Sequence, residues 1–264
     1  MSVHATLAHP APTPTAPAPE ALADRILARS DADETEVMLE RRAGGSTRFA
    51  NNAITQNISS RARSLTVRVS YGGRSGAAAT NDLSEAGADA ALARARGAAR
   101  SAPADPEHVP CAPAQAFPAT DGWSEATAAA TPADRARAVS AAIAEARKGG
   151  ATLAGSFHTG SAETLVATSR GARGLWRRAR ATYANTAMEG DASGWAEAAE
   201  TDVARVDPVA RCRIAVEKAH SARRPRVLPP GAYTVVLEPA ATAEMLAFLA
   251  WTLDARAADE GRSW

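Results

Sequence analysis

The sequence has little of what marks a secreted, disulfide-stabilised or nucleic-acid-binding protein. Its two cysteines, Cys111 and Cys212, stand far apart without a CxxC motif or a Cys/His cluster, which is typical of unpaired thiols in a reducing compartment. Aromatic residues make up only 5% of the chain, so platforms on which bases could stack are scarce. The charges nearly cancel, at 30 Lys+Arg against 29 Asp+Glu, whereas a dedicated nucleic-acid binder carries a basic excess.

Long apolar runs are missing too. No segment approaches the roughly 20 apolar residues that a membrane helix requires. The N-terminus also lacks the basic region followed by an apolar stretch that marks a secretory signal. We therefore expect a cytoplasmic protein with no membrane partner. A chain of 264 residues with 45% hydrophobic residues is long enough to bury one large core or two modest ones.

Proline and glycine divide the chain into five predicted parts. Residues 1–19 are rich in Ala, Pro and Thr and predict a disordered tail. Residues 20–101 predict an N-terminal α+β domain, and residues 131–228 predict a central α+β domain. Between these two domains, the proline-rich residues 102–130 predict a linker across the surface. Residues 229–264 are expected to begin a C-terminal domain that is truncated.

The N-terminal domain is predicted to contain an antiparallel sheet. Residues 36–40 and 47–58 are expected to form a hairpin around a turn at Gly44-Gly45. Residues 64–70 alternate apolar and polar side chains, which indicates a half-buried strand, and residues 75–80 are expected to return as the next strand.

Capping residues mark where helices begin. Asp82 is expected to cap a helix that runs to about Ser101, with Glu85 completing a capping box. Thr131 is a favourable N-cap, and Pro132 follows it at a position where a missing N–H costs nothing. Further helices are predicted at residues 20–30, after Asp207-Pro208 and after Glu238-Pro239.

The second half of the chain predicts another set of strands. Glycines separate four strand-like pieces, which we expect to form an antiparallel meander: residues 152–158, 163–168, 174–188 and 193–200. Residues 233–237 are also expected to form a strand. The helix that follows is apolar on most of its surface, so we expect it to be buried on several sides. The fold class predicted is α+β, with antiparallel sheets packed with helices and an incomplete second α+β segment.

Three stretches together resemble the TldD/PmbA metalloprotease family, whose members have also been called modulators of DNA gyrase. They are residues 47–57, 73–84 and 230–239, and Ser193-Gly194-Trp195 is a weaker fourth sign. The resemblance runs from about Asp33 to the last residue. Members of this family continue into a substantial C-terminal domain, so the resemblance implies a C-terminally truncated member.

The resemblance poses one chemical question. The active subunit of the family, TldD, is a zinc peptidase with an HExxxH motif on the helix after the Tyr-x-Val-Val-Leu strand. Counted from that strand without gaps, the motif positions are occupied by Ala247, Phe248 and Thr252. These side chains cannot hold zinc or activate its water. We therefore expect no metal, no cofactor and no catalytic residue in this chain.

The missing motif indicates the zinc-free TldE (PmbA) branch. The resemblance then implies a non-catalytic subunit that forms a heterodimer with a TldD-like zinc subunit and binds unfolded peptides by strand addition. One alternative is a truncated remnant that acts only as a binding or scaffold module. A peptidase active on its own is the least favoured alternative.

Four residues are candidates for a peptide groove, each with a structural alternative. Asn51 and Asn52 could line a groove or simply form a bulge or turn, because Asn tolerates left-handed backbone conformations. Arg178 and Arg180 alternate onto one face of a strand, which suits a solvated sheet surface. An acidic or peptide partner is the next interpretation for these arginines, and DNA is the last.

The remaining candidates favour structural roles. His158 is expected to be a surface or hydrogen-bonded core histidine. His108, His4 and His9 have no further ligand at usable spacing for a metal. Ser75 and Ser84 have no nearby His in the sequence and no GxSxG motif. Residues 72–76 are glycine-rich but lack the Gly-Lys-Ser/Thr ending of a phosphate loop, so they predict a hairpin turn.

Overall fold

The computed structural model describes residues 18–263. The predicted disordered tail lies outside the described residues, as do His4 and His9, except that Pro19 already belongs to the first helix. None of the helices described is long and apolar enough to cross a bilayer.

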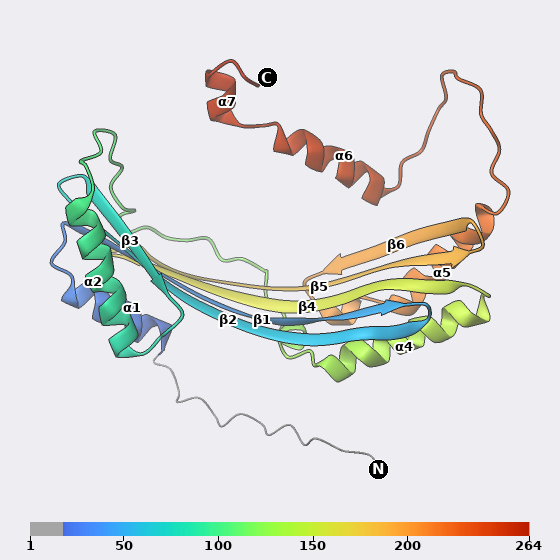
Figure 1. The fold of residues 1–264 in the computed structure, drawn as a ribbon, viewed down its shortest axis with the longest axis horizontal. Coiled ribbons are helices and arrows are strands. Elements are labelled where there is room, and N and C mark those ends of the chain that lie inside the picture. Colours follow the sequence, from blue (N-terminus) through green and yellow to red (C-terminus); the bar gives the residue numbers. More distant parts are fainter. Residues whose placement is uncertain (1–17, 264) are drawn as a thin grey trace, which may run out of the picture.

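The described residues form one six-stranded sheet in the order β3-β2-β1-β4-β5-β6, with every neighbouring pair antiparallel. The strands are β1 (Glu34–Ala50), β2 (Ala53–Tyr71), β3 (Arg74–Thr80), β4 (Thr152–Thr168), β5 (Arg173–Glu189) and β6 (Ala192–Glu200). The sheet is curved, and the helices α1 (Pro19–Arg29), α2 (Glu85–Ser101), α4 (Pro132–Lys148) and α5 (Pro208–Ser221) lie against its convex side (Figure 1). The predicted α+β class is confirmed.

Strand β1 joins the two units that the sequence predicts. It pairs with β2 on one side and with β4 on the other, from Glu36 opposite Thr168 to Phe49 opposite Gly155. Strand β4 has 17 residues and spans about 55 Å at a rise of about 3.3 Å per residue. The pieces predicted at residues 152–158 and 163–168 are therefore parts of one strand.

The prediction of a turn at Gly44-Gly45 is wrong, because β1 continues through both glycines. They allow close approach inside the sheet. A Cβ on Gly44 would lie 2.6 Å from the carbonyl oxygen of Thr159, and one on Gly45 would lie 2.2 Å from Nη2 of Arg135. The turn of the hairpin is instead formed by Asn51 and Asn52, whose φ angles are 52° and 56°.

The helices begin close to their predicted positions. They are α1 (Pro19–Arg29), α2 (Glu85–Ser101), α3 (Glu125–Ala128), α4 (Pro132–Lys148), α5 (Pro208–Ser221), α6 (Pro239–Trp251) and α7 (Ala255–Asp259), with a 3₁₀ turn at Val203–Arg205. Thr131 caps α4 in a capping box, as predicted. The cap of α2 is Ser84, which accepts from the N–H of Gly87, whereas Asp82 accepts from the N–H of Ser84. Asp82 thus shapes the turn that precedes the cap.

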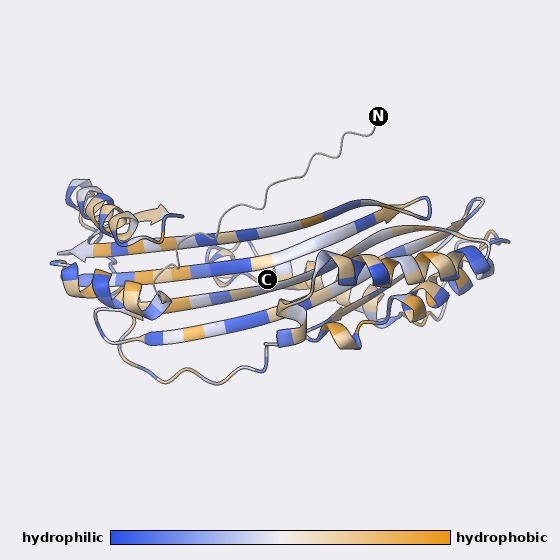
Figure 2. Ribbon diagram, turned by 90° about the horizontal axis from the view of Figure 1, so that it is seen from below, coloured by the Kyte–Doolittle hydropathy of each residue, from blue (hydrophilic) through white to orange (hydrophobic). Residues whose placement is uncertain are grey.

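Two hydrophobic cores lie under the two ends of the sheet. In the first, α4 and α5 pack on the sheet around Phe49, Phe157 and Tyr183, whose rings stack or meet edge to face. In the second, α1 and α2 pack around residues such as Leu39 and Leu65. Seen from the helix side, the middle of the sheet between the two helix pairs is uncovered, and its strands are largely hydrophilic there (Figure 2).

The C-terminal segment differs from the prediction. Residues 233–237 form no strand, and Val236 is 95% exposed. Helix α6 forms, but its apolar side chains are exposed instead of buried, with Phe248 at 60% and Trp251 at 82%. A strand needs a neighbouring strand, and an apolar helix needs a packing surface. Residues 18–263 supply neither to this segment.

Candidate functional site

The sheet face opposite α1, α2, α4 and α5 carries a groove of about 660 Å³ across β1, β4, β5 and β6. Side chains alternate along a strand, so residues next to the buried Phe157 and Ala181 point away from the helices. His158, Arg180 and Thr182 line the groove for this reason, together with Arg42 and Arg178. Of the four residues predicted for a peptide groove, the structure brings Arg178 and Arg180 into this one.

Glycine makes the floor of the groove hollow. Gly160 on β4 pairs with Gly44 on β1 and with Arg180 on β5, so two of three adjacent positions on this face have no side chain. Ala162 fills the next row between Arg42 and Arg178. A ligand that reaches this floor would meet backbone and methyl groups between guanidinium groups.

Arg178 and Arg180 have no carboxylate within ion-pair distance among residues 18–263. The guanidinium carbon of Arg178 lies 5.1 Å from the centre of the Trp176 ring, a cation–π contact. Nε of Arg180 donates to Oγ1 of Thr182 at 3.3 Å. Arg42, in contrast, is paired with Glu40 at 3.2 Å. Most N–H donors of Arg178 and Arg180 are therefore available to a ligand.

His158 is a titratable residue of this groove and lies opposite Thr182 on β5. Its Nε2 lies 3.0 Å from Oγ of Ser156. Partial burial, and then the positive charges of Arg48 and Arg135, hold the pKa of His158 below its usual value. The ring is therefore uncharged at neutral pH, where it can donate or accept a hydrogen bond.

The structure does not bring Asn51 and Asn52 to this groove. Nδ2 of Asn52 donates to the carbonyl of Ala151 at 3.0 Å, and its Oδ1 accepts from the N–H of Leu153 at 2.8 Å. Gly160 lies seven residues further along β4, which is about 23 Å in an extended strand. The Asn pair forms the hairpin turn and fastens it to the start of β4.

The positions of the HExxxH motif lie on α6 and just beyond its end, apart from the sheet (Figure 1). Ala247 and Phe248 offer no donor atom. Oγ1 of Thr252 donates to the carbonyl of Leu249 at 2.8 Å, at the end of the helix. Within residues 18–263, no three His, Cys, Asp or Glu side chains lie close enough together to share a metal ion.

The other candidates have structural roles. His108 lies 3.0 Å from the carboxylate of Glu34, which ties the proline-rich segment to β1. Ser84 caps α2. Gly72 and Gly73 form the turn between β2 and β3 with φ angles of 53° and 76°, as the hairpin prediction requires.

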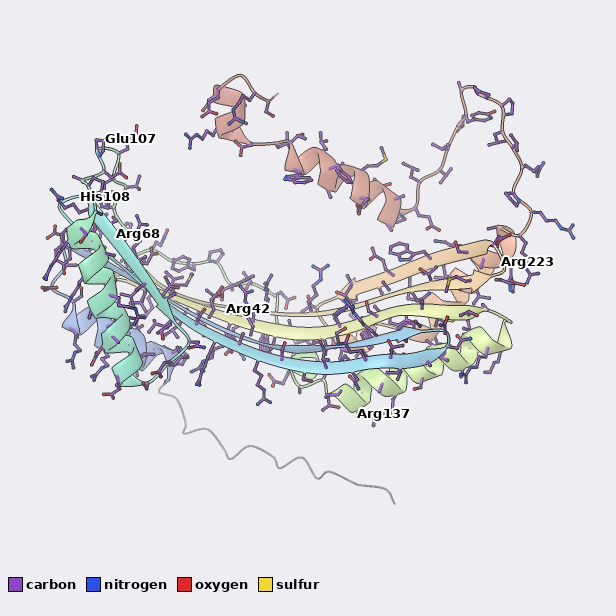
Figure 3. All side chains as sticks on the ribbon, in the orientation of Figure 1. Arg42, Arg68, Glu107, His108, Arg137 and Arg223 are labelled. Atoms are coloured by element: carbon purple, nitrogen blue, oxygen red, sulfur yellow. The ribbon has the colours of Figure 1, made fainter. Side chains whose placement is uncertain are left out.

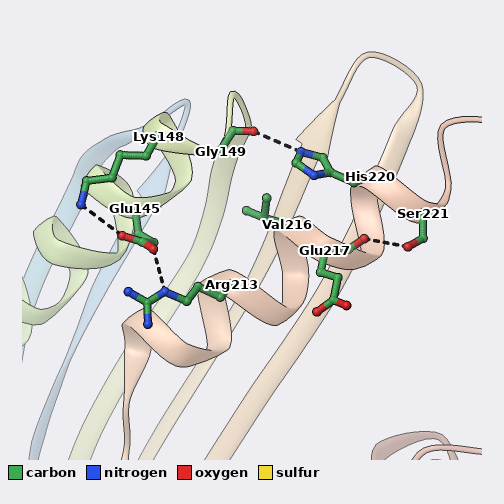
Figure 4. A pocket seen from close by; sticks show the side chains of 8 residues that line it. All are labelled: Glu145, Lys148, Gly149, Arg213, Val216, Glu217, His220 and Ser221. Carbon is green, nitrogen blue, oxygen red and sulfur yellow. Dashed lines mark hydrogen bonds and ion pairs between the residues drawn. The ribbon is translucent and has the colours of Figure 1, made fainter.

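A second cleft of about 530 Å³ lies between the ends of α4 and α5 (Figure 4). Glu145 accepts from Arg213 at 2.6 Å and from Lys148 at 3.3 Å, so its charge is compensated. His220 contacts the carbonyl of Gly149 at 3.1 Å and the carboxylate of Glu189 at 3.1 Å. These contacts join the two helix ends and leave no nucleophile with a base beside it among the residues that line this cleft.

Two residues of the sheet-face groove give no signal in the sequence alone. Arg42 and Glu200 are not distinguished there, because their position beside Arg178 and Arg180 depends on the pairing of β1 with β4 and of β5 with β6. The alternation of buried and exposed residues is the available signal, but it gives only the face of each strand.

Comparison with known proteins bears on both the family and the fold. Residues 35–99 match the model of a family described as PmbA/TldA metallopeptidase domain 1. The fold is similar to that of TldE from Thermococcus kodakarensis, with a TM-score of 0.66 and 16% identity over 76% of this chain and 46% of that chain. It is also similar to a putative modulator of a DNA gyrase from Thermotoga maritima, with a TM-score of 0.69 and 14% identity over 80% of this chain and 50% of that chain.

A putative modulator of DNA gyrase from Bacteroides thetaiotaomicron gives a TM-score of 0.71 and 16% identity over 90% of this chain and 56% of that chain. The chain thus spans about half the length of these solved proteins, and at such identities the likeness concerns the fold. No curated protein matches the chain.

Proposed function

We propose that the chain, whose residues 35–99 match the first domain of the PmbA/TldD family, is a TldE-like, non-catalytic subunit of a metallopeptidase of that family. In this role it acts in the cytoplasm and holds unfolded polypeptide, while a TldD-like partner carries zinc and cuts the peptide bond. Ala247, Phe248 and Thr252 support this division, because they supply neither zinc ligand nor general base.

The free edge of β6 suits an extended polypeptide. Strand β6 ends the sheet, and no described strand pairs with its outer side. An added strand would form main-chain hydrogen bonds whatever its sequence, which suits a subunit that accepts many unfolded chains. Trp195 pairs with Thr186 and is 42% exposed, so it offers an apolar surface beside this edge.

The sheet-face groove is the observation that carries the proposal. Ala199 and Glu200 of β6 line it together with Arg178 and Arg180. A strand added to β6 would therefore lie beside guanidinium groups that have no carboxylate partner among the described residues. Guanidinium donors bind carbonyl oxygens, which every polypeptide presents along its length.

Binding of a neutral, unstructured, fluorescein-labelled peptide to the full chain tests the groove. The variant Arg178→Gln/Arg180→Gln should bind about tenfold more weakly by fluorescence anisotropy, a loss of about 1.4 kcal/mol. Arg137→Gln is the matched control, since Arg137 lies on the outer surface of α4 (Figure 3). Equal affinity of both variants for the peptide would contradict the proposed site.

Zinc content and cleavage test the division of labour. The purified chain should hold far less than one zinc ion per molecule and should leave an unfolded peptide intact, whereas a mixture with a TldD-like subunit should cleave it. Cleavage by this chain alone, abolished by a chelator, would overturn the proposal.

A further inference from the structure

A row of charged residues crosses the uncovered helix-side face between the two cores. We call this region the waist and define it by Arg41, Arg61, Arg63, Glu163 and Arg177. Arg63 on β2 lies opposite Arg41 on β1, Arg41 lies opposite Glu163 on β4, and Glu163 lies opposite Arg177 on β5. The row thus extends across four neighbouring strands.

The strand register fixes the face on which this row lies. Each of the residues Arg63, Arg41 and Glu163 has a leucine two positions away on its own strand. These leucines are Leu65 on β2, Leu39 on β1 and Leu165 on β4, and they are buried against the helix pair α1 and α2. Residues two apart on a strand share a face. The charged row therefore begins where the helices stop covering the sheet, in the hydrophilic band that Figure 2 shows.

The waist is a hollow of about 740 Å³ with a strong excess of positive charge. Four of its five defining residues are arginines. Glu163 is paired with Arg177 at 2.7 Å, and Arg41 is also engaged in a contact of its own. Arg61 and Arg63 are exposed and have no ion pair within the described part of the chain. The pKa of Asp82 is lowered mainly by hydrogen bonds from Ser84, and the more distant charge of Arg63 adds to this effect.

Two further features add positive potential and a stacking surface. Helix α2 begins at the waist, since Leu83, two residues before its first residue, lines the hollow. Helix N-termini carry partial positive charge. On the other side, the guanidinium of Arg177 lies 3.8 Å from the centre of the Trp123 ring.

Arg61 and Arg63 gain no ion pair from the described residues, although they lie two residues apart on the same face of β2. A bound anion would compensate the charge that these two guanidinium groups share. The ligand should also tolerate the carboxylate of Glu163 in the middle of the row. This carboxylate repels a ligand that carries a negative charge on every residue or nucleotide.

We propose that the waist binds an acidic, extended polypeptide segment, through carboxylates held by Arg61 and Arg63. Four strands at a spacing of about 4.8 Å span roughly 14 Å from first to last, which an extended chain crosses in about four residues. Such a segment can place a neutral residue over Glu163 and carboxylates on either side. A nucleic-acid strand cannot, because it carries a phosphate at every nucleotide.

Fluorescence anisotropy with labelled peptides tests the waist on the full chain. A peptide of alternating Glu and Ala should bind at least about tenfold more tightly than one of alternating Gln and Ala, and high salt should weaken its binding. Arg61→Gln/Arg63→Gln should remove this preference, while the control Arg137→Gln keeps it. Glu163→Gln should tighten binding of the acidic peptide about threefold, a gain that a misfolded variant could not give.

Three outcomes would overturn the inference. They are equal binding of the acidic and the Gln peptide, an unchanged affinity in Arg61→Gln/Arg63→Gln, and tighter binding of single-stranded oligonucleotides than of the acidic peptide. The waist is independent of the proposed function. Loss of neutral-peptide binding in Arg178→Gln/Arg180→Gln tests only the sheet-face groove, because this groove and the waist lie on opposite faces of the sheet.

Discussion

The guanidinium of Arg135 occupies the space that the missing side chain of Gly45 leaves open. A Cβ on Gly45 would lie 2.2 Å from Nη2 of Arg135. Arg135 is 1% exposed, and it donates to Oγ1 of Thr159 at 2.8 Å and to the carbonyl of Ile58 at 3.1 Å. It has no carboxylate partner in the described part of the chain, and burial lowers its pKa. A single buried cation thus links α4 to β1, β2 and β4.

Arg135→Ala should lower the free energy of unfolding by about 3 kcal/mol, because it leaves a cavity and unpaired polar groups. Arg135→Met should cost less, since it fills the space without burying a charge. Urea denaturation of both variants checks this. Both variants lose the same hydrogen bonds, so a larger loss for Met than for Ala would contradict the packing argument.

Gly45→Ala should be destabilising by about 1–3 kcal/mol, as overpacking of a filled site is. Combining it with Arg135→Ala should restore only part of the loss, because the added Cβ would still lie 2.4 Å from the carbonyl oxygen of Ile58. A double-mutant cycle measures that part. Gly97→Ala on α2 is the control, since a Cβ added to Gly97 would meet no atom within 4 Å and the φ of Gly97 is not left-handed.

Asn52→Ala should lower the free energy of unfolding by about 2 kcal/mol. The change removes two hydrogen bonds to the backbone at the start of β4 and places Ala at a positive φ. Asn51→Gly should be nearly neutral, because glycine adopts positive φ readily. Urea denaturation measures both variants. Equal losses would contradict the fastening role given to the Asn52 side chain.

The two thiols should differ sharply in reactivity. Burial raises the pKa of Cys212 to about 11, and its Sγ lies 3.3 Å from the carbonyl of Ala142. Cys111 is partly exposed. A thiol reagent at neutral pH should modify Cys111 in the folded protein and reach Cys212 only in denaturant. Mass spectrometry of the modified peptides identifies the site.

His158 should make stability depend on pH in one direction. Its pKa is lowered in the folded state, so the unfolded chain takes up a proton at higher pH than the folded chain. Stability should therefore fall as the pH drops through about 6.5, the ordinary value for His. The variant His158→Gln should show a smaller fall between neutral and mildly acidic pH, measured by urea denaturation.

Local signals in the sequence predict the outline of the fold. The cap at Thr131, the cap at Asp207 and the alternation in residues 64–70 each depend on neighbours in the sequence, and each prediction is confirmed. The turn predicted at Gly44-Gly45 is wrong because those glycines respond to Arg135 and Thr159, which are distant in the chain. A glycine in the sequence is compatible both with a turn and with close packing against a strand, and the sequence alone does not distinguish the two.

The candidate site depends even more on distant pairing. Alternation along one strand is enough to show that Arg178 and Arg180 share a face. Their meeting with Arg42, and the row from Arg63 to Arg177, follow from the register between strands, which no local pattern contains. The strand predicted at residues 233–237 is wrong because these residues include β-branched side chains but have no partner strand among residues 18–263.

Strands β1 and β4 run without interruption from one hydrophobic core to the other. A shift of one residue in their pairing would turn every buried side chain at both ends outward at once. The two cores therefore hold each other in register across the open middle of the molecule. A force or a ligand that shifts one helix pair would therefore also act on the other helix pair, through the backbones of β1 and β4.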